Sequence, residues 1–302
     1  MAGSRKGKGR EKKQIRFLNL LDPILKKIHW TFLGVDLWLS FPALFYPQFE
    51  LLDSIELDDE EKDAKNENNE QEIFDEARLS PTDNELWNQL MAANPGLEDI
   101  LNIMYKKNEQ TLMALIAQLK VSACSAWSKD IKLMKEEAPD YVREFKANKL
   151  VDSFTATGSK TERGDFIQRI EDNGLKFKGT DWPAFLWSPG TKYNAKQRLK
   201  GMFRSFMVPR GLRTVYFGKM TMLNKNITSS RPPKAGIHSL KRIEAIHVAY
   251  VCVLIYFSLT NLISWRTKYF SFSLRRFYYN IIALLSSKKP WAEEILKYYG
   301  PP

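Results

Sequence analysis

Large apolar residues recur at helical spacing in the second quarter of the chain and predict an array of amphipathic helices. Leu86, Leu90 and Met91 follow one helical face until Asn94-Pro95-Gly96 interrupts the pattern. The pattern then resumes and continues to about residue 135, with apolar positions Leu97, Ile100, Leu101, Met104, Leu112, Leu115, Ile116 and Leu119. Asp83 is predicted to cap the first helix, which would start at residue 84 or 85.

The C-terminal half predicts further helices that irregular segments join. Residues 139–181 are mixed and polar and predict a long irregular connection. A turn over residues 182–187 precedes a predicted basic amphipathic helix from about Asn194 to Met207 and a short element of uncertain type. Helices are then predicted over about 241–265, 273–287 and 290–299. The predicted fold class is mainly α, an irregular multi-helix domain with long loops.

The N-terminal quarter differs from this helical domain, which is predicted to span residues 80–302. Residues 1–14 lack apolar content and predict a disordered basic tail. Residues 15–49 are aromatic but contain three prolines, which predicts short helices or turns that dock on the body of the chain or on a protein partner. Residues 50–79 are acidic and rich in asparagine, and predict a disordered linker.

Charge is segregated along the chain, so the net charge of +11 hides three blocks. Residues 1–30 carry nine Lys/Arg and two acids, whereas residues 50–85 carry fifteen acids and three bases. Residues 141–302 carry 28 bases and ten acids. Two interpretations of the acidic linker stay open: it is a solvated spacer, or it folds over the basic half and competes with polyanions.

The strongest candidate for a functional surface is residues 182–243, which hold thirteen Lys/Arg and no Asp or Glu. Such a run creates a positive potential that attracts polyanions. On the predicted helix, Lys196, Lys200 and Arg204 recur at i+4 and would form one stripe. The predicted nucleic-acid-binding residues are Lys196, Arg198, Lys200, Arg204, Arg210, Arg213, Lys219, Lys241 and Arg242.

Aromatic residues are interleaved with these cations and have two interpretations. Some would stack on bases in a nucleic-acid binder, or all would belong to the core while the cations only keep the surface soluble. The residues concerned are Trp187, Tyr193, Phe203, Phe206, Tyr216 and Phe217. The expected partner is DNA, RNA or another polyanion, and no preference for a base sequence is predicted because no known recognition motif occurs.

An uncharged run, residues 245–265, allows either a buried helix or a membrane span. Its 21 residues are long enough for a hydrocarbon layer of ~30 Å. Against insertion, Glu244, His247, Ser258 and Asn261 fall on one side of a helical wheel. A buried central helix with one polar edge is the preferred interpretation, and a membrane anchor is the alternative.

Signatures of catalysis and of metal binding are missing, so neither an enzyme nor a cofactor nor a metal site is predicted. The sequence contains no G-x-S-x-G, H-E-x-x-H, C-x-x-C or G-x-G-x-x-G. His238 and His247 are nine residues apart, without acids or cysteines at ligand spacing. Cys124 and Cys252 are expected to be small apolar side chains in a reducing compartment.

The N-terminus predicts an intracellular protein. Its basic run has no apolar stretch behind it and therefore does not resemble a secretory signal. The KGKGREKK sequence is either a nuclear-import signal, a nucleic-acid arm or a solvated tail.

Short blocks of sequence resemble an uncharacterised helical domain family that is widespread in basidiomycete fungi. In the first half the blocks are Glu85-Leu86-Trp87, Pro95-Gly96-Leu97 and the helix that ends in SACSAWSKDIKLMK. In the second half they are the turn Trp182-Pro183-Ala184-Phe185-Leu186, the residues Gly201, Phe203, Arg204 and Phe206, then Ser229-Ser230, Ala235-Gly236-Ile237-His238, Ala249-Tyr250-Val251, Phe277-Tyr278-Tyr279-Asn280, Leu284-Leu285 and Trp291.

The resemblance covers about residues 83–299 and implies a helical fold and a fungal source, because the family has no established activity. The chain departs from the family in its short basic middle connection and in a more apolar helix after His247. From the residues themselves we expect a non-enzymatic protein that binds nucleic acid or another polyanion through a basic helical surface. The alternatives are a membrane anchor over residues 245–265 and an interaction scaffold that captures a protein through residues 15–49. The sequence indicates no oligomeric state.

Overall fold

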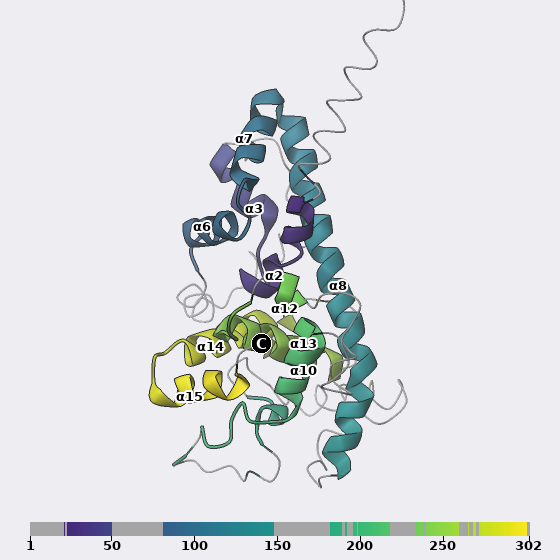
Figure 1. Cartoon of the computed structure of the whole chain (residues 1–302), viewed down its shortest axis with the longest axis vertical. Helices are drawn as coiled ribbons and strands as arrows, with labels where there is room; N and C mark the ends of the chain where they lie inside the picture. Colours follow the sequence, from purple (N-terminus) through teal and green to yellow (C-terminus); the bar gives the residue numbers. More distant parts are fainter. Residues whose placement is uncertain are drawn as a thin grey trace, which may run out of the picture. The chain divides into compact units, whose positions relative to one another are not determined.

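The chain is mainly helical in a computed structural model (Figure 1). The structure describes residues 21, 23–49, 81–147, 182–188, 191, 196–197, 199–217, 234–237, 240–259, 265, 268–269 and 272–300, with α8 side chains to residue 136. Two compact units are distinguished: the first comprises residues 1–70 and 81–127, and the second comprises residues 71–80 and 128–302. The predicted tail and linker, and thus the predicted boundary at residue 80, lie outside the described residues.

Prolines divide the aromatic segment of the first unit into short helices, as predicted. These are α2 (Thr31–Gly34), α3 (Phe41–Phe45) and the 3-10 helix η1 (Pro47–Phe49). Pro42 stands in the first turn of α3, where its missing N–H needs no partner. The Ser40 hydroxyl accepts a hydrogen bond from the Ala43 N–H at 3.3 Å and caps this helix.

The first unit continues with α6 (Asp83–Ala93), α7 (Leu97–Lys107) and the beginning of α8 (Glu109–Ala147). The residue that caps α6 is Thr82, one position before the predicted Asp83. The Thr82 Oγ1 accepts from the Glu85 N–H at 3.3 Å, and the Glu85 carboxylate accepts from the Thr82 N–H at 2.8 Å. Gly96 has φ +88°, a conformation that glycine adopts without strain, and separates α6 from α7 as predicted.

Aromatic residues of the N-terminal segment 15–49 pack on α6 and α7 within the first unit. Phe45 is fully buried, and its ring meets the Trp87 ring edge-on at a centroid distance of 5.6 Å. The centroid of the Phe49 ring lies 6.4 Å from that of Trp87 and 5.1 Å from that of Tyr105. Phe45 and Phe49 therefore contribute to the core of their own unit, and a protein partner for residues 15–49 stays a prediction.

Helix α8 is longer than its apolar pattern predicts. The helix continues from residue 135 to Ala147 and thus occupies the start of the segment that was predicted to be irregular, residues 139–181. Pro139 removes one backbone hydrogen bond without ending the helix, so the prediction of an irregular segment from residue 139 is wrong. Residues 148–181 lie outside the described residues.

The second unit is built around α13 (Ala245–Leu259), which packs against α10 (Met207–Phe217) and α14 (Leu274–Leu285). Helix α12 (Lys234–Ile237) adjoins α10, and α15 (Pro290–Tyr299) adjoins α14. The 3-10 helix η3 (Ala184–Leu186) also lies against α10. Strands β1 (Lys268–Tyr269) and β2 (Phe272–Ser273) form an antiparallel pair before α14. The predicted closing helices, 273–287 and 290–299, are confirmed.

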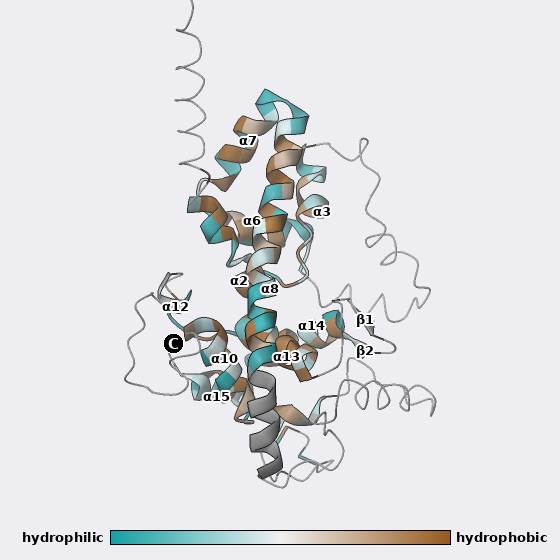
Figure 2. Ribbon diagram, turned by 90° about the vertical axis from the view of Figure 1, so that its right-hand side faces the viewer, coloured by the Kyte–Doolittle hydropathy of each residue, from teal (hydrophilic) through white to brown (hydrophobic). Residues whose placement is uncertain are grey.

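Helix α13 is the buried central helix that the sequence predicts. It is hydrophobic along its length (Figure 2), and its polar residues His247 and Ser258 are buried too. Its 15 residues correspond to about 22 Å at the usual rise per residue. No helix in the described part of the chain combines the length and the apolar character that crossing a bilayer requires. Residues 260–264 of the predicted span lie outside the described residues.

The predicted helix from Asn194 to Met207 is wrong. The described residues between 196 and 206 form turns, and Gly201 and Phe203 have φ values of +75° and +58°, which lie outside the right-handed helical region. The chain pairs instead with the segment after η3, where the Ser188 N–H donates to the Gly201 carbonyl at 2.9 Å. The helix begins only at Met207, so the element of uncertain type after Pro209 is part of α10.

Candidate functional site

Two predicted cations lie on the outer face of α10. The inner face is buried and packs closely against α13, because a Cβ added at Gly211 would lie 2.5 Å from the Val251 side chain. Arg213 is exposed and Arg210 is half-buried, three residues earlier on the same helical face. The Arg210 guanidinium lies over the ring of Phe206 at 5.6 Å. We name Arg210 and Arg213 the α10 arginines.

Arg204 is held by two residues of α15. Its guanidinium forms an ion pair with Glu294 and lies over the Tyr298 ring at 5.6 Å. The side chains of Arg204 and Glu294 are 37% and 64% exposed, so solvent reaches this pair. A carboxylate from another helix therefore meets a cation of the acid-free tract.

The other predicted cations have different surroundings. Lys196, Lys200 and Lys241 are exposed, and Arg242 forms a 2.8 Å ion pair with Glu244. The predicted stripe of Lys196, Lys200 and Arg204 is wrong, because no helix spaces these residues by one turn. Arg198 and Lys219 lie outside the described residues.

The interleaved aromatic residues divide between core and surface. Phe203 and Tyr216 are fully buried, so neither is available to stack on a base. Trp187, Phe206 and Phe217 are half-buried, and Tyr193 lies outside the described residues. The sequence prediction missed Tyr298, which is 50% exposed beside Arg204. No local pattern indicates this pair, because the two residues are 94 positions apart in the chain.

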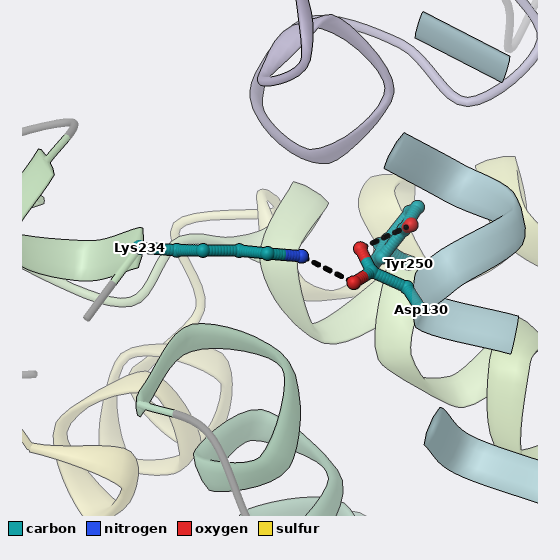
Figure 3. Close-up of polar contacts among 3 residues, drawn as sticks. All are labelled: Asp130, Lys234 and Tyr250. Carbon is teal, nitrogen blue, oxygen red and sulfur yellow. Dashed lines mark hydrogen bonds and ion pairs between the residues drawn. The ribbon is translucent and has the colours of Figure 1, made fainter. Parts of the chain in front are cut away.

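A second group of polar residues lies inside the second unit (Figure 3). Asp130 of α8 is 2% exposed; Lys234 of α12 binds its Oδ1, and the Tyr250 hydroxyl of α13 donates to its Oδ2 at 3.1 Å. Desolvation raises the pKa of Asp130, whereas the Lys234 charge and the hydrogen bonds from Lys234 and Tyr250 oppose that rise. The Asp130 carboxylate therefore links α8 to α12 and α13.

His247 lies in the core of the second unit. Its ring meets the fully buried Tyr216 at 5.4 Å, and its Nδ1 accepts from the Glu244 N–H at 2.9 Å. Desolvation lowers the pKa of His247 to about 4, although the charge of Glu244 acts in the opposite direction. Within the described ranges, no group of three or more His, Cys, Asp and Glu side chains is arranged to hold a metal.

Both cysteines are thiols, and burial raises the pKa of each. Cys252 is fully buried in α13, which confirms it as an apolar core residue, and Cys124 is half-buried in α8. Asp130 and His247 are buried, whereas the α10 arginines and the Arg204–Tyr298 pair lie at the surface and form the candidate site.

Residues 159–300 match a family of unknown function (DUF6698). The chain therefore carries a domain of unknown function over this range, which contains the α10 arginines, Arg204 and the helices α13 to α15. The N-terminal half of the predicted resemblance, from residue 83, lies outside the match. Neither a curated protein nor a solved structure matches the chain.

Proposed function

We propose that this protein binds nucleic acid or another polyanion, without catalysis, through a cationic surface that contains the α10 arginines, Arg204, Lys200 and Lys241. The observation that carries the proposal is the outer face of α10, where Arg210 and Arg213 face away from a closely packed core. No acidic residue of α10 itself competes for them. From the fungal resemblance we also expect a fungal source.

Arg204 and Arg242 belong to the acid-free tract and have carboxylate partners that solvent reaches, so both cations stay accessible to a phosphate. The pairs Arg204–Glu294 and Arg242–Glu244 are exposed, and such pairs contribute only about 0–1 kcal/mol, so a phosphate can compete with either carboxylate. Lys234 differs because its partner Asp130 is buried. We therefore do not include Lys234 in the proposed cationic surface. A group of exposed cations on a folded unit then attracts polyanions in a salt-dependent way.

Replacement of both α10 arginines tests the proposal. In R210Q/R213Q we expect the affinity for a labelled 20-mer nucleic acid to fall roughly tenfold or more, and the slope of log affinity against log salt to decrease by about two. Fluorescence anisotropy across a salt series measures both quantities. The control K27Q/K106Q removes two exposed lysines of the first unit and changes the net charge equally. Equal losses in the two variants, or binding that does not depend on salt, would contradict the proposal.

Glu294 provides a second test, because it is the carboxylate that pairs with Arg204. E294Q removes the competitor of a phosphate, so we expect binding to tighten about two- to fivefold at low salt. The neighbouring exposed Glu293 is the matched control, since E293Q changes the net charge identically without an ion pair to Arg204. If both substitutions tighten binding to the same degree, only the net charge matters and Arg204 is not part of the surface.

A further inference from the structure

Arginines and aromatic rings are stacked in pairs on this surface. Arg204 lies over Tyr298 at 5.6 Å, and Arg210 lies over Phe206 at 5.6 Å. The two arginines are six residues apart in the chain, which limits the distance between their Cα atoms to about 20 Å even in a fully extended segment. Two places are thus present where a positive charge and a π-face lie together.

Tyr298 is the more accessible of the two rings. Its side chain keeps 50% of its surface exposed, while the next residue on α15, Tyr299, donates its hydroxyl hydrogen bond to the Phe203 carbonyl. That hydrogen bond and the buried Ala292 and Ile295 fix α15 to the unit. Tyr298 therefore lies on an anchored helix, with Arg204 over its ring and half of its surface still exposed to a ligand.

The position of the Arg204 guanidinium is fixed from two sides. Glu294 and Tyr298 are one helical turn apart on α15, so the ion pair and the ring contact hold the same group. A ligand phosphate that replaces the Glu294 carboxylate meets a cation that is already oriented beside the ring. A base next to that phosphate would then lie over Tyr298.

We infer that the polyanion bound here is single-stranded nucleic acid, with Tyr298 as a stacking platform for a base and Arg204 and the α10 arginines as phosphate contacts. The inference rests on the proposed polyanion binding. In a duplex the bases are already stacked on one another and present only their edges in the grooves, so an aromatic ring gains no stacking contact. Anionic lipid headgroups offer phosphates but no π-face. Single strands offer both, and stacking on an aromatic side chain is worth several-fold in affinity per base.

Tyr298 substitutions test the inference by fluorescence anisotropy on a single-stranded 20-mer and on the duplex of the same sequence. We expect the wild-type protein to prefer the single strand and Y298L to lose about fivefold or more of that affinity. Y298F, which keeps the ring, retains it, and duplex binding changes less than about twofold because phosphate contacts remain. Y105L replaces a tyrosine of similar exposure in the first unit and is expected to bind like wild type.

The outcomes separate this inference from the proposed function. A protein that binds both nucleic acids equally, or a Y298L variant that binds the single strand normally, overturns the stacking platform while the effect of R210Q/R213Q still supports polyanion binding. Absence of salt-dependent binding to either nucleic acid overturns both. Y298F and Y298L should share the melting temperature of wild type, and a Y298L loss without a preference for the single strand also counts against the platform.

Discussion

The variant K234M is expected to lose about 3 kcal/mol of unfolding free energy at pH 7, because it leaves the buried carboxylate of Asp130 without its cation. The expected loss lies at the lower end of the range for buried pairs, since 36% of the Lys234 side chain is exposed and solvent weakens the pair. Urea denaturation measures the change. The control K241M removes an exposed lysine of the same unit and should have little effect.

The loss in K234M is expected to depend on pH. Lys234 lowers the pKa of Asp130 through its charge and its hydrogen bond, so its removal raises that pKa further above the ordinary value of 3.8. A folded-state pKa above the unfolded one means that the native state binds the proton more tightly. Stability is therefore retained below the unfolded pKa and is lost as the pH rises through the folded value. The difference between wild type and K234M should be small near pH 4 and grow toward pH 8.

A double variant separates an unpaired charge from a simple loss of contacts. In D130N/K234M no carboxylate remains at this position, and the introduced amide still offers an oxygen to the Tyr250 hydroxyl, so the double variant should be more stable than K234M at pH 7. If the stability losses of the single variants D130N and K234M add up in the double variant, the pair contributes through packing alone. A K234M loss that does not change with pH would mean the same.

Much of the helical structure could be predicted from local patterns. The break at Asn94-Pro95-Gly96 and the two closing helices follow from apolar spacing and from residues that disfavour a helix, which are local properties of the sequence. The incorrect prediction of a helix before Met207 also has a physical cause. Its apolar residues Met202 and Phe203 do become buried, but pairing with the segment at Trp187 imposes turns that periodicity cannot indicate.

The surface was predicted less well than the core, because a count of charges along the sequence does not include partners from distant helices. Glu294 pairs with Arg204 across 90 residues and Asp130 pairs with Lys234 across 104 residues, so one cation of the tract has an exposed carboxylate partner and another has a buried one. The α10 arginines were on the predicted list, but the face that they share depends on where α10 begins. Tyr298 became a candidate only through its tertiary contact with Arg204.

His247 is expected to make the protein less stable as the pH falls from about 6.5 to about 4. Burial beside Tyr216 lowers its folded-state pKa from 6.5 to about 4, so in this range the unfolded state binds a proton that the native state excludes. The unfolding free energy should therefore decrease by about 3 kcal/mol across this window through His247, at 1.36 kcal/mol for each pKa unit. Asp130 acts with the opposite sign, since its pKa is raised, so the contribution of His247 must be isolated by difference.

The variant H247N isolates it, because the asparagine oxygen can accept the Glu244 N–H in place of Nδ1 while the side chain no longer titrates. We expect wild type minus H247N to change by about 3 kcal/mol between pH 7 and pH 4 in urea denaturation, and an NMR titration of the His247 ring should give its midpoint near the lower value. E244Q removes the charge that raises this pKa and should therefore deepen the dependence at the acidic end. A difference that stays constant over the window would show that His247 accepts its proton as readily in the folded protein as in the unfolded chain.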